Sequence, residues 1–224
     1  MKKKLTAILP LILILSLAAC GSSPSSDGTS AKSSSAGSVS AKSVSSESVA
    51  AESAADSTVA GTHHAEIVIR DYGTVTVELD GDAAPITVEN FIGLANDKFY
   101  DGLTFHRIID GFMIQGGDPN GNGTGGSDKT IKGEFSENGV ENPISHEPGV
   151  ISMARSQDPD SASSQFFITV GDATYLDGQY AAFGHVTEGM EVVEKIAKDA
   201  EPADGNGTIP PEAQPVIETI RILD

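Results

Sequence analysis

The sequence is poor in cysteine, in basic residues and in long apolar runs. Because Cys20 is its only cysteine, neither an intrachain disulfide framework nor a zinc site built on several cysteines can form. The chain of 224 residues has 14 Lys and Arg against 32 Asp and Glu, a formal net charge of −18. Its only basic run is Lys2–Lys4. Since phosphate contacts need clustered Lys and Arg, we expect no nucleic-acid partner.

The first twenty residues have the layout of an export signal. Lys2–Lys4 precede an apolar run over 5–17, which contains Pro10 and is shorter than a typical transmembrane helix. The run ends in Leu17-Ala18-Ala19-Cys20-Gly21, which resembles a bacterial lipobox, the motif whose cysteine is acylated after cleavage. We therefore expect a lipoprotein signal peptide over 1–19 and lipidation at Cys20. The alternatives are an uncleaved anchor and an ordinary signal peptide with an unrelated cysteine.

A serine-rich segment follows the cysteine. Of the 40 residues from Gly21 to Ala60, 16 are Ser and none is aromatic. Such a composition cannot bury enough apolar surface to offset its ordering entropy, so residues 20–62 are predicted to be a disordered tether. Forty flexible residues have a root-mean-square reach of roughly 35 Å. The protein is thus expected on the extracytoplasmic face of the cell membrane, and the long tether favours a Gram-positive cell surface.

Residues 63–224 are predicted to be one folded domain that carries most of the acidity. Residues 61–224 contain 9 Lys and Arg against 28 Asp and Glu, and 9 − 28 = −19. One helix is predicted to begin at Pro85, with Val88, Phe91, Ile92 and Ala95 facing inward, and a second is predicted over 189–197. Short β-rich runs are expected over 65–70, 74–79, 104–109, 112–115, 150–154, 165–170, 181–186 and 216–223. Many short strands with only two helices indicate an all-β barrel or sandwich.

The sequence offers little for ordinary catalysis or metal binding. It has no nucleophile elbow, phosphate-binding loop or HExxH pair, and its histidines are scattered. Asp118, Asn120, Asn122 and Gly123 match the first half of a calcium-binding loop, but Lys129 occupies the position of the essential bidentate Glu. We interpret this stretch as a glycine-rich surface loop and expect no metal or other cofactor.

The stretch 105–118, FHRIIDGFMIQGGD, places polar residues where a buried strand would have apolar ones. Taken alone, Arg107 could be an arginine that extends along the sheet to its rim. The whole stretch, however, closely resembles the signature of the cyclophilin family of peptidyl-prolyl isomerases. Four further segments agree with that family in order and spacing. They are 85–91, 122–126, 149–154 with 164–168, and 176–178 with 183–184.

This resemblance implies a closed eight-stranded antiparallel β-barrel, capped by two α-helices, with a groove that binds Xaa-Pro segments. It assigns catalysis to Arg107, which would donate to the prolyl nitrogen of a twisted amide, and to Gln115, which would position Arg107. The other positions that match the family's substrate groove are His106, Phe112, Met113, Ala154, Arg155, Ser156, Gln165, Phe167, Tyr175, Leu176 and Tyr180.

Three groove residues depart from the pattern of eukaryotic family members. Tyr175 replaces a tryptophan whose indole N–H binds the drug cyclosporin, so we expect weak cyclosporin binding with activity retained. Tyr180 replaces a histidine of the pocket wall, and Arg155 replaces an asparagine. These changes affect ligand preference more than catalysis.

Three functions fit such a chain to different degrees. The first is a lipid-anchored, extracytoplasmic isomerase that accelerates folding of exported proteins. The second is a membrane-tethered chaperone or adhesion module that binds proline segments with little turnover. The third, a solute-binding lipoprotein, would need a longer chain with alternating strands and helices.

Overall fold

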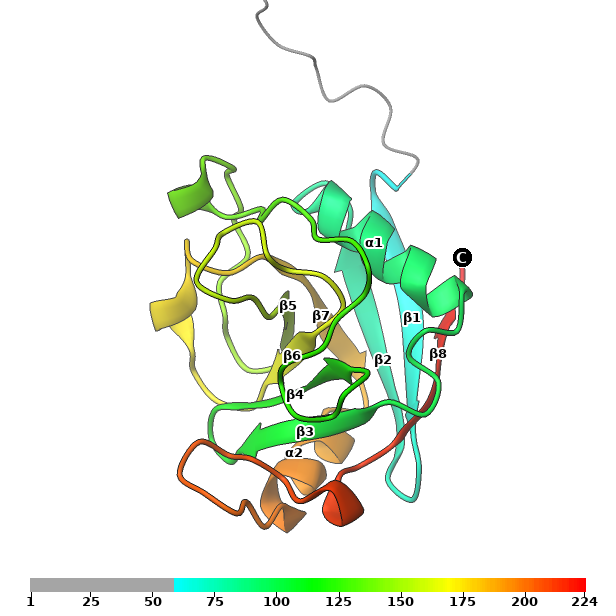
Figure 1. Cartoon of the computed structure of the whole chain (residues 1–224). Helices are drawn as coiled ribbons and strands as arrows, with labels where there is room; N and C mark the ends of the chain where they lie inside the picture. The colour runs from blue at the N-terminus through cyan, green and yellow to red at the C-terminus, as the bar shows by residue number, and fades with distance from the viewer. Residues whose placement is uncertain (1–58) are drawn as a thin grey trace, which may run out of the picture. The chain divides into compact units, whose positions relative to one another are not determined.

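The computed structural model describes residues 59–224, which fold as a curled β-sheet with two helices (Figure 1). The predicted signal peptide, Cys20 and nearly all of the predicted tether lie outside these residues. The strands are β1 (Thr62–Ile69), β2 (Gly73–Asp80), β3 (Thr104–Ile109), β4 (Met113–Asp118), β5 (Val150–Met153), β6 (Phe166–Thr169), β7 (Ala182–Glu188) and β8 (Ile217–Ile222). The helices are α1 (Pro85–Asn96) and α2 (Met190–Asp199), and short 3-10 turns are η1 (Ser136–Asn138), η2 (Thr174–Leu176) and η3 (Pro211–Ala213).

The eight strands form one antiparallel sheet in the order β3-β4-β6-β5-β7-β2-β1-β8. Its two edge strands, β3 and β8, meet over a short seam. There the Phe105 N–H donates to Pro215 O at 2.9 Å, and the Ile217 N–H donates to Leu103 O at 2.8 Å. The all-β, eight-stranded fold is therefore confirmed. Its description as a closed barrel was too strong, because β8 continues past the seam to pair with β1 alone.

Alternation along the strands explains which faces are buried. In β2, Val75, Val77 and Leu79 are fully buried, whereas Glu78 between them is half-buried and faces outward. Inside the sheet the Phe91 ring lies 5.3 Å from the Tyr100 ring and 5.6 Å from the Phe166 ring. These aromatic contacts make the centre of the core, since each ring removes a large apolar area from water.

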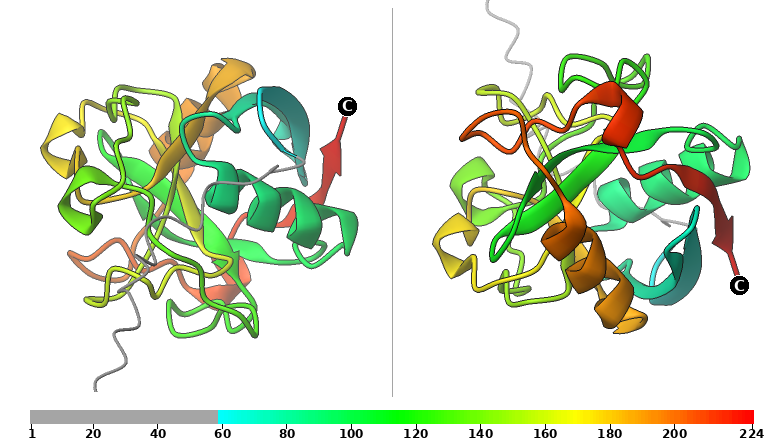
Figure 2. Two further views of the ribbon diagram at one scale, coloured as in Figure 1. Left: turned by 90° about the horizontal axis from the view of Figure 1, so that it is seen from above. Right: turned by 90° about the horizontal axis from the view of Figure 1, so that it is seen from below.

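The two helices cover opposite ends of the barrel, as Figure 2 shows from above and below. Helix α1 begins at Pro85 as predicted, because proline suits the first turn, where its missing N–H costs nothing. Val88, Phe91 and Ala95 are buried, and Ile92 packs partly against the core. Helix α2 runs two residues beyond the predicted end. None of the helices in residues 59–224 has the length and apolar character needed to cross a bilayer.

Candidate active site

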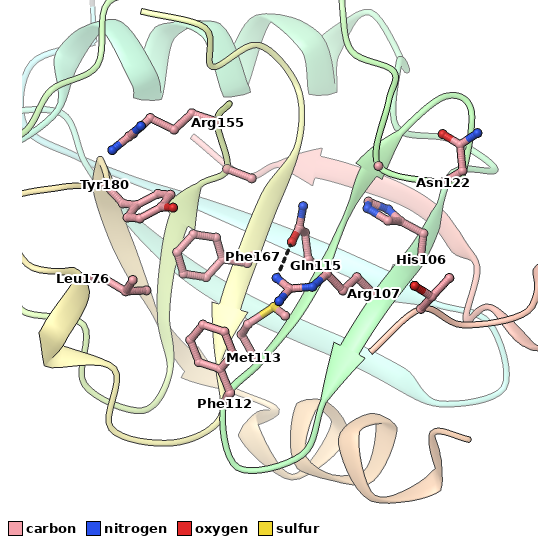
Figure 3. Close-up of a pocket in the computed structure, with 13 residues that line it drawn as sticks. His106, Arg107, Phe112, Met113, Gln115, Asn122, Arg155, Phe167, Leu176 and Tyr180 are labelled. Carbon is pink, nitrogen blue, oxygen red and sulfur yellow. Dashed lines mark hydrogen bonds between the residues drawn. The ribbon is translucent and has the colours of Figure 1, made fainter. Parts of the chain in front are cut away.

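The central feature of the site is a cross-strand pair on β3 and β4. Phe105 pairs with Gly116 and Arg107 pairs with Gln115, so His106 is an extra residue in β3 and forms a β-bulge. A bulge re-aims the side chains that follow it. Here it places Arg107 directly opposite Gln115, and Arg107 Nη1 donates to Gln115 Oε1 at 3.2 Å (Figure 3).

The Arg107 guanidinium has a second anchor on a distant segment. Its Nε–H donates to the backbone oxygen of Asn206 at 2.8 Å. Two of the five N–H groups of a guanidinium are thus engaged within the protein, and the others can serve a ligand. The two anchors lie on different atoms of a planar group, so together they fix its orientation.

A chain of side-chain amides orients Gln115. Its Nε2 donates to Gln165 Oε1 at 3.0 Å, and Gln165 Nε2 donates to Gly125 O at 2.7 Å. Because a carbonyl can only accept, this chain determines which end of each amide faces which neighbour. The Gln115 oxygen therefore points to Arg107.

An apolar pocket lies next to this polar pair. The cavity has a volume of about 330 Å³. Met113 and Phe167 form buried parts of its lining, with exposed fractions of 1% and 4%. The complete lining is His106, Arg107, Phe112, Met113, Gln115, Asn122, Gly123, Ala154, Arg155, Phe167, Leu176, Tyr180 and Thr208. A ring-shaped apolar group can thus sit beside a fixed cation.

Phe167 is held from both sides by other rings. On the inner side His146 stacks on it, with ring centroids 6.0 Å apart and planes inclined by 15°. On the outer side Tyr180 meets it edge-on at 6.0 Å. The three rings of the pocket wall are therefore closely packed, which limits the rotamers that Phe167 can adopt.

Behind this wall His146 belongs to a Ser–His–Asp arrangement, in which His146 and Ser152 are buried and Asp177 is exposed. Its Nδ1 lies 2.8 Å from Asp177 Oδ1, and its Nε2 lies 3.0 Å from Ser152 Oγ. Burial lowers the pKa of His146, although the Asp177 carboxylate opposes the shift. Ser152 is fully buried, so no substrate can reach its hydroxyl. The arrangement is structural: it joins Phe167 to the η2 turn that carries Leu176.

His106 is the polar residue of the cavity without a protein partner. Its side chain is 3% exposed, and neither ring nitrogen has a hydrogen-bond partner among the described residues. Burial lowers the pKa of His106, the Asp118 charge opposes this, and the Arg107 charge adds to it. The imidazole is therefore neutral near pH 7 and can accept or donate one hydrogen bond to a ligand.

The loop that begins at Asp118 is organised around its own carboxylate. Asp118 accepts the backbone N–H groups of Asn120 at 2.8 Å and Asn122 at 3.0 Å, together with that of Gly123. Burial raises the pKa of Asp118, but these donors outweigh it and lower the pKa overall. The loop thus holds Asn122 and Gly123 against the cavity.

Most of the residues that the sequence assigned to the groove line this cavity, but three do not. Ser156 and Gln165 line an adjoining hollow of about 240 Å³, which shares Gln115, Ala154 and Arg155 with the main cavity. Tyr175 lines neither hollow. It is 63% exposed, and its ring lies 5.9 Å from that of Phe112 at the rim.

The structure also adds residues that sequence reasoning missed. Asn122 and Gly123 line the cavity, and their place in a glycine-rich loop beside the signature stretch was the available signal. Thr208 lines it as well, and no sequence pattern marked that position.

The Arg155 side chain lies along the groove wall. Its guanidinium carbon is 4.7 Å from the centre of the Tyr180 ring and 5.1 Å from that of Phe135. Its Nε–H donates to Gln179 O at 2.9 Å. Arg155 therefore supports the tyrosine that replaces the family histidine.

Comparison with known proteins agrees with this geometry. A family model described as cyclophilin type peptidyl-prolyl cis-trans isomerase matches residues 64–223, which include both β3 and β8. The chain belongs to this family. The cross-strand pair of this cyclophilin, Arg107 and Gln115, thus lies within the matched domain.

Relatives are found among both sequences and solved structures. The cyclophilin is 46% identical over 130 residues to peptidyl-prolyl cis-trans isomerase B of Bacillus subtilis, covering 58% of this chain and 87% of the relative. It is 45% identical over 126 residues to a peptidyl-prolyl cis-trans isomerase of Helicobacter pylori strain J99, covering 55% of this chain and 75% of that one.

The fold resembles that of a cyclophilin-type peptidyl-prolyl cis-trans isomerase from Cryptosporidium parvum. The TM-score is 0.63 at 29% identity, with 73% of this chain and 99% of the other covered. A second structure of that protein, in the presence of the dipeptide Ala-Pro, gives a TM-score of 0.61 at 30% identity and covers 72% and 99%.

Proposed function

We propose that this isomerase accelerates Xaa-Pro isomerisation in exported proteins while anchored by a lipid at the extracytoplasmic face of the membrane. The observation that carries the catalytic part is the doubly anchored Arg107 beside an apolar pocket. The lipobox and the serine-rich segment support the location. Uncatalysed isomerisation takes tens to hundreds of seconds, so it limits the folding of proteins that emerge unfolded from export.

The chemical task is rotation about one C–N bond. Amide conjugation, which uses the nitrogen lone pair, imposes a barrier of about 18–20 kcal/mol. No bond is made or broken, so the protein must bind the twisted amide better than either planar form. Neither a nucleophile nor an electron carrier takes part in such a reaction.

The apolar side and the polar side of the groove have different roles in this rotation. Phe112, Met113 and Phe167 hold the proline ring, so that rotation moves the chain before the proline. Arg107 donates to the prolyl nitrogen, whose lone pair becomes available as conjugation is lost. This hydrogen bond grows only in the twisted state, which is the condition for lowering the barrier.

Pre-organisation makes the arginine effective. Gln115 and the Asn206 carbonyl fix its plane before substrate arrives, so little reorganisation is needed during rotation. A binding module without turnover needs only the apolar pocket and gains nothing from a fixed cation. The anchored guanidinium therefore favours an enzyme over the alternative of a proline-binding chaperone or adhesion module.

The activity is tested by NMR exchange spectroscopy on a short Ala-Pro peptide, with the wild type and Arg107→Ala. We expect the wild type to accelerate cis/trans exchange and Arg107→Ala to lose about 10²-fold in kcat/KM, as when a pre-organised donor is removed. Peptide binding should persist in the variant. No acceleration by the wild type would support the binding module instead, and equal acceleration by both proteins would refute the catalytic role of Arg107.

The location is tested separately on the protein made in a Gram-positive host. Mass spectrometry of the mature N-terminus should show cleavage before Cys20 and a lipid-modified cysteine, and Cys20→Ser should release the protein from the membrane fraction. An unmodified chain that begins at Met1 would refute the anchor while leaving the activity untouched.

A further inference from the structure

A short turn that is far in sequence from the stretch 105–118 lies against the outer edge of β3. The Ile108 N–H donates to Gly207 O at 2.8 Å, and the Ile209 N–H donates to His106 O at 2.9 Å. Thr208 forms an isolated bridge with Arg107 and lines the cavity. The segment between α2 and β8, orange to red in Figure 1, runs past β3 in this way. We call residues 204–208 the anchor turn.

The anchor turn presents one carbonyl to Arg107. The Nε–H of Arg107 donates to Asn206 O at 2.8 Å, shorter than the 3.2 Å bond from its Nη1 to Gln115 Oε1. The two bonds restrain different N–H groups of the same plane. Loss of the carbonyl would therefore let the guanidinium pivot about its bond to Gln115.

The side chain of Asp204 shapes the turn. It accepts the backbone N–H groups of Asn206 at 2.9 Å and of Thr208 at 3.1 Å, and the Thr208 hydroxyl at 2.9 Å. An aspartate that accepts backbone N–H groups ahead of it is a common way to fix a turn. All three bonds lie on the solvent side of the turn, where Asp204 is exposed.

Glycine is required at position 207, directly after Asn206. Gly207 has φ +85°, and a Cβ there would lie 2.6 Å from Ile108 O and 2.5 Å from Ile109 Cγ1. A side chain would thus push the turn off β3. The close approach brings the Asn206 carbonyl within reach of Arg107.

We propose that the anchor turn is a positioning device for the catalytic arginine, in which Asp204 and Gly207 act through the Asn206 carbonyl. The proposal rests on the proposed role of Arg107. Of the turn, only Thr208 lines the cavity, so the effect of the turn should fall on rotation of the amide and not on binding of the proline. The separation of about a hundred residues makes the contact invisible to local sequence patterns.

The test compares Asp204→Ala with Asp80→Ala. Asp80 also fixes a turn, accepting the N–H groups of Asp82 at 3.0 Å and Ala83 at 2.9 Å, but it lines no part of the groove. We expect Asp204→Ala to lower kcat about tenfold with KM and peptide affinity unchanged, because a displacement of about 1 Å can cost up to 10²-fold. Asp80→Ala should leave kcat unchanged. Asp204→Asn, whose amide oxygen still accepts the N–H groups, should restore most of the rate.

A double-mutant cycle shows whether the effect passes through Arg107. In the Arg107→Ala background, Asp204→Ala should have no further effect on kcat. The Arg107 Nε–H resonance should also shift and exchange faster with water in Asp204→Ala. The proposal is overturned if Asp204→Ala behaves like Asp80→Ala, or if its loss persists without Arg107. If Arg107→Ala itself keeps full activity, the proposed role of Arg107 fails and the turn has nothing to position, whereas no acceleration by the wild type would refute the proposed function.

Discussion

The groove has two walls of opposite chemistry, and each is held in a different way. The apolar wall consists of rings in contact: His146 stacks on Phe167, Tyr180 meets Phe167 edge-on, and Arg155 covers the Tyr180 ring. The polar wall consists of hydrogen bonds from Arg107 to Gln115, from Gln115 to Gln165, and from Gln165 to Gly125. The packed rings fix the volume of the pocket, and the hydrogen bonds fix the orientation of the Arg107 guanidinium.

Under the proposed mechanism, the two walls have separate functions. A pocket of fixed volume binds the proline ring about equally in the planar and twisted states, which contributes to affinity. A donor of fixed direction interacts best with the nitrogen of the twisted state, which contributes to rate. Changes to the apolar wall should therefore act mainly on KM, and changes to the polar wall mainly on kcat.

The largest effect is expected for Arg107→Lys, which keeps the charge of the polar wall but removes its planar fork. A lysine cannot bond Gln115 and the Asn206 carbonyl while aiming at the prolyl nitrogen, so we predict a loss of about 10²-fold in kcat, close to that of Arg107→Ala. NMR exchange on a proline peptide measures it. Near-normal activity in the lysine variant would mean that charge alone suffices.

Phe167→Leu should have the next largest effect, on the apolar wall. The smaller side chain loses contact with both His146 and the bound proline ring. We expect KM to rise roughly tenfold, equivalent to about 1.4 kcal/mol, while kcat changes little. Steady-state kinetics separates the two constants, and a thermal melt checks that the variant is folded. A loss confined to kcat would contradict the division between the walls.

Gln165→Leu should have a smaller effect on the polar wall. Leucine at position 165 has no oxygen to accept the Gln115 N–H, so the Gln115 amide loses the bond that orients it. The loss of one hydrogen bond of about 1 kcal/mol should lower kcat about fivefold. Gln165→Glu keeps the acceptor for Gln115 but loses the N–H donated to Gly125 O, so its kcat should fall between those of the wild type and Gln165→Leu. If both variants lose kcat equally, the amide chain does not orient Arg107.

The smallest effect is expected on the pH dependence of the free energy of unfolding, through His146 behind the apolar wall. The pKa of His146 is lowered by burial, so the unfolded chain binds more protons than the folded one below the ordinary histidine pKa of about 6.5. The free energy of unfolding should therefore fall as the pH decreases from about 7 through the lowered pKa of His146. His146→Asn should weaken this pH dependence.

His64 provides a control of opposite sign. A hydrogen bond from its ring to Asp224 raises the pKa of His64, so this residue stabilises the fold below about pH 6.5 and loses that contribution as the pH rises through its raised pKa. His64→Asn should therefore steepen the loss of stability on acidification. Urea unfolding at pH 7.5 and pH 5.5 measures both variants, and slopes that change in the same direction would contradict the assignment.

Local patterns predicted the elements of the fold closely. Alternation identified β2, a short apolar run identified β3, and Pro85 marked the start of α1. The stretch 105–118 resembled the family signature, and that resemblance indicated the Arg107–Gln115 pair, whose partners lie on adjacent strands of one hairpin. Contacts between residues close in sequence leave a periodicity that can be read without the fold.

Other features of the site could not be predicted in this way. The contact of Arg107 with Asn206 joins residues 99 positions apart and uses a backbone oxygen, which every residue has. The exposure of Tyr175 outside the cavity depends on how the η2 turn packs. The short seam between β3 and β8 depends on the curl of the whole sheet, to which no single strand contributes a pattern.

By itself, the sequence determined the strands and the helices, because side-chain periodicity and residue type act locally, and its resemblance to the family indicated the groove residues. Only the tertiary structure decided that the anchor turn meets β3, that Asp177 and Ser152 hydrogen-bond to His146, and that the pocket rings pack on one another. These contacts form when distant segments come together, and their free energy depends on a geometry that no short stretch encodes.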